Sequence, residues 1–362
     1  MIPTTDLAEL TIDLAAIVAN WRSLAARHPG AVAAVLKADA YGTGATHVAP
    51  ALFTAGCRHF FTAHLQEALA IRTLVPGAML AVLNGLPPGA EPDFIAHDIR
   101  PVLGSLAEII SWSAAARRHG KPLPALLHVD TGMNRLGLTH GDVQTLAADP
   151  SRLDGITLDY VMTHLVSAEC PADPLNHRQR TSFAAACARL PLAPCSLANS
   201  SGLFLGAAFH SDLARPGAAL YGINPTPGHP NPMRATLRLR ARILQIRDVP
   251  KGETVGYNGQ WTATRPSRIA TISVGYADGF LRSLGNRATA HFDGSPIPLV
   301  GRVSMDLSTF DVTDTPAAQP SAWLELIGPS MPIDDIAARA GTNAYELLTS
   351  LGHRYSRTYL SA

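Results

Sequence analysis

The stretch that decides the fold is AVAAVL at residues 31–36, six consecutive apolar residues followed by Lys37. A short apolar run bounded by a polar residue is typical of a buried strand in a parallel sheet. Seven further runs of this kind follow, at residues 60–63, 79–83, 100–103, 125–129, 158–163, 195–198 and 213–215. The chain between residues 31 and 222 therefore contains eight expected strands.

Helical patterns separate these runs, with apolar residues three and four positions apart at 66–74, 106–118 and 178–190. Strands that alternate with helices predict right-handed crossovers and a parallel sheet. Eight such units in about 200 residues favour a (β/α)8 TIM barrel over an open doubly wound sheet. No G-x-G-x-x-G follows an expected strand, which argues further against a dinucleotide-binding sheet.

The pattern changes after Gly222, where the Pro/Gly-rich segment 223–231 (INPTPGHPN) forms a connector. Residues 237–243 then alternate apolar and polar side chains, as a half-buried strand does. Further strands are expected at 269–274, 298–303, 308–312 and 323–327, and helices at 333–339 and 344–351. We therefore predict an α/β protein with a barrel over residues 8–226 and a mostly β domain over 227–362.

Composition excludes several classes of protein. The 362 residues include 29 basic and 28 acidic side chains, a net charge of +1, which argues against a nucleic-acid or anionic-membrane partner. The first residues, MIPTTDLAEL, lack the features of a secretory signal, and the uncharged stretch 190–211 is too broken by polar residues and proline for a membrane helix. Four cysteines without a C-x-x-C pair are expected to be scattered buried thiols in a cytoplasmic protein, not disulfides or metal ligands.

In a barrel of this kind the active site lies at the C-terminal ends of the strands. The side chains that follow the expected strands there are Lys37, Asp130, Arg135, His164, Asn199, Ser200 and Arg215. Cations, a histidine and hydroxyl or amide groups outnumber carboxylates in this set. The set therefore suits an anionic ligand. A glycosidase would need two opposed carboxylates here, and a metal hydrolase a cluster of histidine and aspartate. We expect no metal.

Lys37 is the most informative of these residues. Burial and neighbouring cations lower the pKa of a lysine and leave a nucleophilic amine that can form a Schiff base. Taken alone, each residue favours a structural interpretation: Lys37 as a lysine that extends to solvent, Arg135 as part of an ion pair, and His164 as a core histidine. Their convergence at the strand ends favours a functional site. The loops after strands seven and eight often bind phosphate in this fold, which is where Ser200 and Gly217-Ala218 lie.

Several motifs resemble those of alanine racemases and occur in the order of that family. Lys37-Ala38-Asp39-Ala40-Tyr41-Gly42 resembles the family's lysine motif for pyridoxal phosphate (PLP), and residues 128–137 (HVDTGMNRLG) resemble its second hallmark. Further matches are 162–164 (MTH), 198–200 (ANS), 215–217 (RPG), 221–222 (YG), Tyr257, 275–279 (GYADG) and 301–306 (GRVSMD). The resemblance covers nearly the whole chain.

The resemblance implies a PLP-dependent enzyme that interconverts L- and D-alanine with two bases, one on each face of the substrate. Lys37 would carry PLP and act as one base. Tyr257, from the other subunit of a head-to-tail homodimer, would be the second. An unperturbed tyrosine has a pKa of about 10, and a chain of Arg215, His164 and tyrosine would lower it.

The resemblance also implies roles for the other site residues. Arg215 would face the pyridine nitrogen, and Arg135 with the Met305 backbone N–H would hold the substrate carboxylate. Tyr276 and Arg282 would line a narrow entrance. The residues expected to bind the cofactor are Lys37, Tyr41, Arg135, His164, Asn199, Ser200, Arg215, Gly217 and Ala218, with the phosphate held by Tyr41, Ser200 and the backbone at Gly217 and Ala218.

Two positions depart from the family pattern. His128 stands where many members have a lysine, sometimes carbamylated, and His353 stands where some have a phosphate-binding tyrosine, with Tyr355 two residues further on. The alternatives are a racemase of broader specificity, a decarboxylase of similar fold, and a non-enzymatic PLP-binding homeostasis protein that resembles the barrel alone. A role in supplying D-alanine for peptidoglycan and one in alanine catabolism fit the sequence equally.

Overall fold

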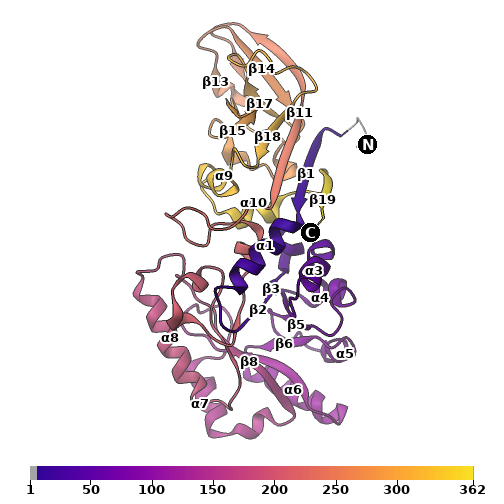
Figure 1. Ribbon diagram of the computed structural model, residues 1–362, viewed down its shortest axis with the longest axis vertical. Coiled ribbons are helices and arrows are strands. Elements are labelled where there is room, and N and C mark those ends of the chain that lie inside the picture. Colours follow the sequence, from indigo (N-terminus) through magenta and orange to yellow (C-terminus); the bar gives the residue numbers. More distant parts are fainter. Residues whose placement is uncertain (1–5, 362) are drawn as a thin grey trace. The chain divides into compact units, whose positions relative to one another are not determined.

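The computed structural model describes residues 6–361, which form two compact units. One unit contains residues 17–40 and 44–234. The other combines the chain up to Ala16, residues 41–43 and the chain from Ala235 onward. In Figure 1 the second unit is mainly orange and yellow, with the indigo strand β1 (Ala8–Asp13) among its strands.

The first unit is built around a parallel sheet whose strands appear in chain order along it, with one exception. The strands are β2 (Ala31–Val32), β3 (Ala34–Val35), β4 (His59–Thr62), β5 (Met79–Val82), β6 (Arg100–Leu103), β7 (Leu123–His128), β8 (Ile156–Met162), β9 (Cys195–Ser196) and β10 (Leu213–Ala214). The sheet starts at β2, passes through β10 and ends at β3. Only Ala33 separates β2 from β3, and its N–H donates to the Ala214 carbonyl at 2.9 Å. One run of chain thus brings the two ends of the sheet together, which confirms the predicted barrel.

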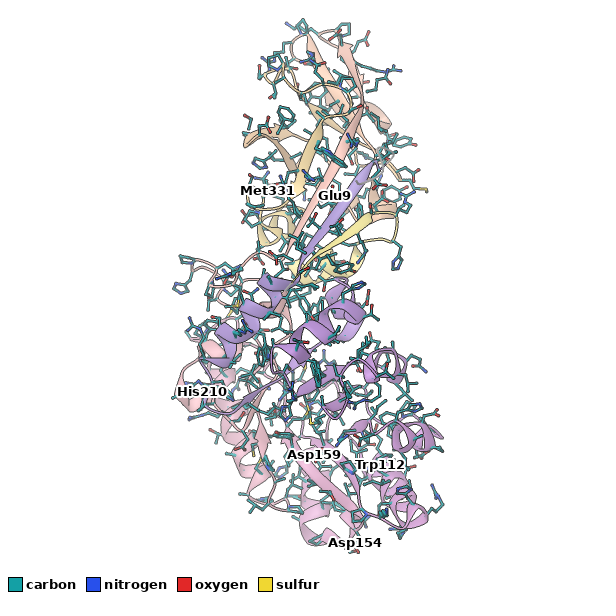
Figure 2. All side chains as sticks on the ribbon, turned by 45° about the vertical axis from the view of Figure 1, so that its right-hand side comes forward. Glu9, Trp112, Asp154, Asp159, His210 and Met331 are labelled. Atoms are coloured by element: carbon teal, nitrogen blue, oxygen red, sulfur yellow. The ribbon has the colours of Figure 1, made fainter. Side chains whose placement is uncertain are left out.

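Helices connect the strands of this unit. They are α1 (Leu14–Ala25), the short turn α2 (Lys37–Tyr41), α3 (Ala45–Thr54), α4 (Leu65–Arg72), α5 (Glu91–Ala96), α6 (Leu106–His119), α7 (His140–Ala148) and α8 (Pro174–Cys187). Trp112 of α6 is fully buried and packs edge-on against Phe94 of α5, with 6.2 Å between the ring centroids (Figure 2). The helix predicted at 178–190 starts earlier because the Asp173 side chain accepts the Leu175 N–H at 2.8 Å and so caps α8.

The second unit is mostly β, as predicted, and its central strand is β11 (Leu237–Val249). Antiparallel to β11 lie β1, β14 (Ser267–Ile272) and β18 (Trp323–Ile327), while β17 (Ser308–Asp311) pairs with β14. β19 (Ser356–Leu360) runs parallel to β1. The unit also contains β12 (Thr254–Val255), β13 (Trp261–Thr262), α9 (Ile333–Ala340) and α10 (Ala344–Ser350).

The predicted strand at 298–303 is wrong. The strands here are β15 (Thr289–Phe292) and β16 (Ser295–Pro298), an antiparallel hairpin whose turn is Asp293-Gly294, both with positive φ. An Asp-Gly pair with this backbone is a strong hairpin signal. After Pro298 only an isolated antiparallel bridge from Leu299 to Phe310 and a hydrogen bond from the Val300 N–H to the Thr309 carbonyl at 2.9 Å continue the pairing, and Gly301 has a φ of 78°. The hairpin turn therefore decides the pairing, and the apolar run after it does not continue as a strand.

The N-terminal segment packs with the second unit because β1 lies between β11 and β19. Leu10 and Ile12 of β1 are fully buried, and Glu9, labelled in Figure 2, accepts a hydrogen bond from Arg240 Nη2 at 3.0 Å. The predicted barrel domain includes residues 8–16. In the structure residues 8–13 form β1 of the C-terminal sheet and residues 14–16 begin α1, and all of them belong to the second unit.

The cysteines differ from the expectation of scattered buried thiols. Only Cys57 is buried, whereas Cys170 is exposed. Cys187 and Cys195 are half-buried, and their sulfur atoms lie 3.4 Å apart. Between residues 6 and 361, the structure has no helix with both the length and the apolar character needed to cross a bilayer.

Candidate active site

The side chains expected at the C-terminal ends of the barrel strands do follow those strands. Lys37 follows β3, Asp130 and Arg135 follow β7, and His164 follows β8. Asn199 and Ser200 come after β9, and Arg215 follows β10 directly. We call this end of the barrel the mouth.

Lys37 is held at the mouth by a left-handed turn. Residues 38–41 all have φ near 55°, a conformation that costs about 1–2 kcal/mol per residue for side chains other than glycine. The Ala38 N–H donates to Glu67 Oε1 at 2.6 Å, and Glu67 Oε2 also accepts the His64 N–H at 3.1 Å. Glu67 therefore links the start of α4 to this turn. Glu67 is absent from the predicted site, although a glutamate at the third position of a helix is the signal of a capping box.

The environment of Lys37 favours a neutral amine. Burial lowers the pKa of Lys37, and the Arg135 cation lowers it further, while Glu67 acts in the opposite direction. A larger fraction of this amine is therefore unprotonated near neutral pH than of an exposed lysine. This is the property that a Schiff-base lysine requires.

Arg135 ends a loop that the Asp130 carboxylate organises. Asp130 Oδ1 accepts the N–H groups of Gly132 and Met133 at 2.9 Å each, and Oδ2 accepts that of Asn134 at 3.0 Å. A carboxylate bound to consecutive backbone donors fixes a loop locally. Among residues 6–361 the Arg135 guanidinium has no hydrogen-bond or ion-pair partner. Its loop is thus ordered while its charge stays available to an anion.

Gln179 of α8 joins this loop to the one that carries His164. Gln179 is fully buried, and its Nε2 donates to Thr131 Oγ1 at 3.1 Å and to the His164 carbonyl at 2.9 Å. Its Oε1 accepts the Val166 N–H at 2.8 Å. The sequence analysis missed this residue, and the only available signal was a polar side chain within a helix.

Arg215 is a buried cation whose hydrogen bonds go to neutral oxygen atoms. It is 4% exposed and donates to Ser196 Oγ and to the Thr163 carbonyl. Burial lowers the pKa of Arg215 to about 10, so it remains charged near neutral pH. No carboxylate pairs with it in the part of the chain that the structure describes. Because a buried unpaired charge is costly, its persistence indicates a functional site.

Two neutral histidines flank Arg215. Burial, followed by the Arg215 charge, lowers the pKa of His164 to about 3 and that of His128 to about 4. Each ring thus carries one N–H donor and one acceptor near neutral pH. The sequence analysis expects a hydrogen-bonded chain from Arg215 to His164. In the structure Arg215 bonds to the carbonyl of Thr163, the residue before His164, and couples to the ring electrostatically.

Ser200 lies in a turn that presents donors. Its Oγ accepts the N–H groups of Gly217 at 3.0 Å and Ala219 at 3.2 Å, which leaves the hydroxyl proton to donate outward. The Ala218 N–H has no acceptor among the described residues. The Asn199 amide is used by the fold, since Nδ2 donates to the Leu165 carbonyl and Oδ1 accepts the Gly202 N–H. Ser200 and Ala218 thus offer donors to an anion, while Asn199 and Gly217 shape the turn.

The remaining predicted site residues belong to the second unit. Tyr41 packs with that unit, and burial raises its pKa to about 12. Tyr257 is 68% exposed and Met305 is 54% exposed, and both line a cavity of about 360 Å³. Tyr276 is half-exposed. The predicted site residues therefore form two groups, one in each unit.

The two departures from the family pattern also have a structural setting. His128 ends β7 and is neutral near neutral pH. The loop that carries Arg135 is held by hydrogen bonds to the Asp130 carboxylate, which belongs to the same loop. His353 is exposed, whereas Tyr355 is buried and its hydroxyl donates to the Asp278 carbonyl at 2.7 Å. The Tyr355 hydroxyl is therefore used within the second unit.

A barrel mouth with a lysine of lowered pKa, two arginines that have no carboxylate partner among the described residues and a turn with free donors defines a lysine-dependent enzyme that binds an anionic cofactor. Residues 12–225 match the family model "Alanine racemase, N-terminal domain", and residues 236–359 match "Alanine racemase, C-terminal domain". The chain belongs to the alanine racemase family.

Individual relatives agree with this assignment. A curated alanine racemase from Acidiphilium cryptum is 60% identical over 352 residues, which cover 97% of this chain and 98% of the relative. The crystal structure of alanine racemase from Bartonella henselae, with covalently bound pyridoxal phosphate, is 42% identical and superposes with a TM-score of 0.95 over 98% of this chain and 99% of that one. The biosynthetic alanine racemase of Pseudomonas aeruginosa is 32% identical, with a TM-score of 0.91 over 98% of this chain and 100% of that one.

Proposed function

We propose that this chain interconverts L- and D-alanine with pyridoxal phosphate as its cofactor. The observation that carries the proposal is Lys37, a lysine with a lowered pKa directly after β3, in the same mouth as the buried cation Arg215. Membership of the alanine racemase family supplies the reaction.

The residues of the mouth fit this cofactor. Lys37 would bind its aldehyde carbon, and the Ser200 hydroxyl with the Ala218 N–H would donate to its phosphate. Arg215 would donate to the pyridine nitrogen, since its buried guanidinium has no carboxylate partner among the described residues. Tyr41 and His164 would also contact the cofactor. Asn199 and Gly217 would contribute by shaping the turn that carries Ser200.

Two bases would move the substrate proton. When bound, pyridoxal phosphate withdraws electrons from the substrate Cα and so makes its proton acidic. The Lys37 amine would take or return this proton on one face and the Tyr257 phenol on the other. A single base tends to return the proton to the side that it left, so inversion requires both.

Arg215 would also restrict the outcome. A guanidinium does not readily release a proton, so it would leave the pyridine nitrogen hydrogen-bonded but unprotonated. The electron withdrawal is then weaker than beside an acid, which limits side reactions such as transamination. The charge that Arg215 retains near neutral pH is consistent with this role.

Substrate binding would use a cation and a backbone donor. Arg135 has a free guanidinium and would pair with the substrate carboxylate, and the Met305 N–H, which has no acceptor among the described residues, would donate to the same group. Tyr276 and Arg282 would line the entrance and favour a small side chain. These contacts select alanine by charge and size.

A homodimer with shared active sites is part of the proposal. Tyr257, Met305 and Leu307 are large apolar side chains that are 40% or more exposed, and all three line the cavity of about 360 Å³. Exposed apolar groups around a cavity are typical of a surface that a partner covers. The partner that we propose is a second copy of the chain, which would receive Tyr257 as its second base.

Incubation of the protein and PLP with L-alanine in D₂O tests the proposal. Cα deuteration followed by NMR, and D-alanine measured by chiral chromatography, are both expected. Cofactor binding without either product would overturn it. The same assay with serine, lysine and arginine tests for broader specificity, and release of CO₂ would identify a decarboxylase instead.

The biological setting completes the proposal. We place the enzyme in the cytoplasm, which fractionation with an antibody against the chain would test. A strain that lacks the gene would require D-alanine if the enzyme supplies peptidoglycan. The same strain would instead fail to grow on alanine as carbon source if the enzyme is catabolic.

A further inference from the structure

We propose that Arg354 is a positioning residue that fixes the Met305 backbone and the Tyr276 turn in the arrangement that receives the substrate. This inference rests on the proposed function, because it takes Met305 and Tyr276 as the residues that meet alanine. It concerns the second unit alone. No feature of the sequence assigns a role to Arg354.

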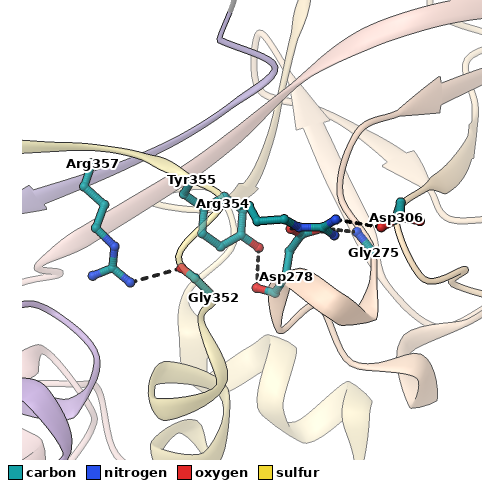
Figure 3. Close-up of polar contacts among 7 residues, drawn as sticks. All are labelled: Gly275, Asp278, Asp306, Gly352, Arg354, Tyr355 and Arg357. Atoms are coloured by element: carbon teal, nitrogen blue, oxygen red, sulfur yellow. Dashed lines mark hydrogen bonds and ion pairs between the residues drawn. The ribbon is translucent and has the colours of Figure 1, made fainter.

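The Arg354 guanidinium bridges two acidic side chains (Figure 3). Its Nε and Nη2 donate to the two oxygen atoms of Asp278 at 2.6 and 2.9 Å, a bidentate pair. Its Nη1 donates to Asp306 Oδ1 at 2.7 Å. One planar group therefore connects the turn that contains Tyr276 to the residue directly after Met305.

Asp278 is the fixed end of this bridge. It is 3% exposed, and its Oδ2 also accepts the Gly275 N–H at 2.9 Å (Figure 3). Its carbonyl accepts the Tyr355 hydroxyl at 2.7 Å and the Gly352 N–H at 3.0 Å. The turn 275–278 is therefore held on both sides.

The turn and the Met305 segment are also in direct backbone contact. The Tyr276 N–H donates to the Ser304 carbonyl at 3.0 Å, and the Ala277 N–H donates to the Met305 carbonyl at 2.9 Å. A Cβ on Gly275 would lie 2.3 Å from the Met305 oxygen, so only glycine allows this approach. Met305 is thus tied to the turn through its carbonyl, while its N–H points to no acceptor among the described residues.

The backbone contacts alone leave Asp306 free to move. Its side chain is half-exposed, and Arg354 is the partner that it has in the structure. The next residue, Leu307, closes a turn by accepting the Ser304 N–H at 2.9 Å. Arg354 therefore restrains this turn through the Asp306 side chain, and Asp306 shares its peptide group with Met305.

Three variants separate the parts of the bridge. Arg354→Met removes both ion pairs, and Arg354→Lys keeps the charge without the bidentate geometry. Asp306→Asn weakens only the connection to the Met305 segment and leaves the buried pair with Asp278 intact. Arg265→Met is the matched control, because Arg265 forms an exposed ion pair with Asp314 in the same unit and contacts neither segment.

Two measurements test the role. We expect Arg354→Met and Asp306→Asn to raise KM for alanine about tenfold or more, the effect of losing a charge-assisted hydrogen bond, with a smaller change in kcat. Amide hydrogen exchange across residues 304–307, measured without substrate, should become faster in the same variants. Arg354→Lys should lie between these variants and the wild type, and Arg265→Met should match the wild type in both measurements.

The outcomes distinguish this inference from the proposed function. Unchanged exchange and unchanged KM in Asp306→Asn would overturn the inference, even if Arg354→Met fails to fold. Faster exchange together with a wild-type protein that does not racemise alanine would keep the positioning role and refute the reaction. A fall in kcat with unchanged KM would overturn the assignment to substrate binding.

Discussion

The side-chain nitrogen of Gln179 lies 2.9 Å from the carbonyl oxygen of His164 and 3.1 Å from Thr131 Oγ1, so one buried amide holds two loops of the barrel mouth. One of these loops carries Arg135 and the other begins at His164. The loops follow neighbouring strands, β7 and β8, so we expect both to reach the same proposed ligand. The helix α8 thereby sets the distance between the groups that would bind substrate and cofactor.

Replacement of Gln179 with methionine should destabilise the protein and impair its site. The change leaves the His164 carbonyl and the Val166 N–H without their buried partner and removes one of the two hydrogen bonds of Thr131 Oγ1, which also contacts Thr163 Oγ1. We expect this to cost about 3 kcal/mol in the free energy of unfolding. Denaturant titration measures this loss. Gln144→Met, at an exposed position of α7, is the control and should change the free energy of unfolding little. Equal effects of the two substitutions would contradict the role of Gln179.

Replacement of Tyr257 with phenylalanine should separate proton exchange from racemisation. The variant should retain its cofactor, because Lys37 and the barrel are unchanged. Racemisation should fall by about 10² to 10⁴, the usual contribution of a positioned acid or base. Cα deuteration in D₂O should persist in one enantiomer, on the face of Lys37. Wild-type turnover of this variant would refute the two-base assignment.

Mixing two inactive variants should restore activity if the sites are shared between subunits. Lys37→Ala and Tyr257→Phe each remove one base, but a heterodimer of the two contains one site with both bases intact. Subunit exchange at random should therefore recover about a quarter of the wild-type activity. Each variant alone, treated identically, is the control. No recovery after demonstrated exchange would place both bases on the same chain.

The lowered pKa of Lys37 predicts a selective reaction with the cofactor. A neutral amine attacks the aldehyde, and burial beside Arg135 shifts the release of its proton to lower pH. Borohydride reduction of apoprotein incubated with PLP at neutral pH should therefore label Lys37 in preference to the exposed Lys121 and Lys251. Peptide mass spectrometry identifies the labelled lysine. Equal labelling of the three lysines would contradict this prediction.

His128 should make the protein sensitive to acid. Its pKa is about 6.5 when unfolded and about 4 when folded, so between these pH values the unfolded chain binds the proton that the folded chain excludes. Stability therefore falls as the pH decreases through this window, by about 3 kcal/mol at pH 4. His128→Gln should flatten this dependence in denaturant titrations at several pH values, while His97→Gln, at an exposed position, should not. A parallel loss in all three proteins would assign the effect to other groups.

The sequence predicts the barrel well because its strands are short, mostly apolar runs that alternate with helical patterns. Its failures occur where pairing depends on distant segments. The residues of β1 and β19 have no run long enough to stand out, and they are strands because each lies against the other. The hairpin at Asp293-Gly294 carried a local signal, but the apolar residues after it suggested a strand of their own.

The residues of the candidate site, too, can be predicted only where the signal lies close by in the sequence. Residues at strand ends, such as Lys37 and Arg215, can be found from the pattern of strands alone. Gln179 and Arg354 lie far along the chain from the loops that they hold, and only the folded structure brings them together. Tyr257 shows no pattern of its own within a glycine-rich turn, so only the resemblance to a family selects it.

The position of β1 has a consequence for how the protein is made. This strand is synthesised before both of its neighbours in the sheet, which are β11 and β19. The barrel can form during translation from segments that follow one another, whereas β1 has to wait until more than 300 further residues have brought β19 into place. Until then, Leu10 and Ile12 remain exposed on the nascent polypeptide. A product that stalls before β11 and β19 would therefore present an unpaired apolar strand, which is the kind of segment that chaperones and proteases recognise.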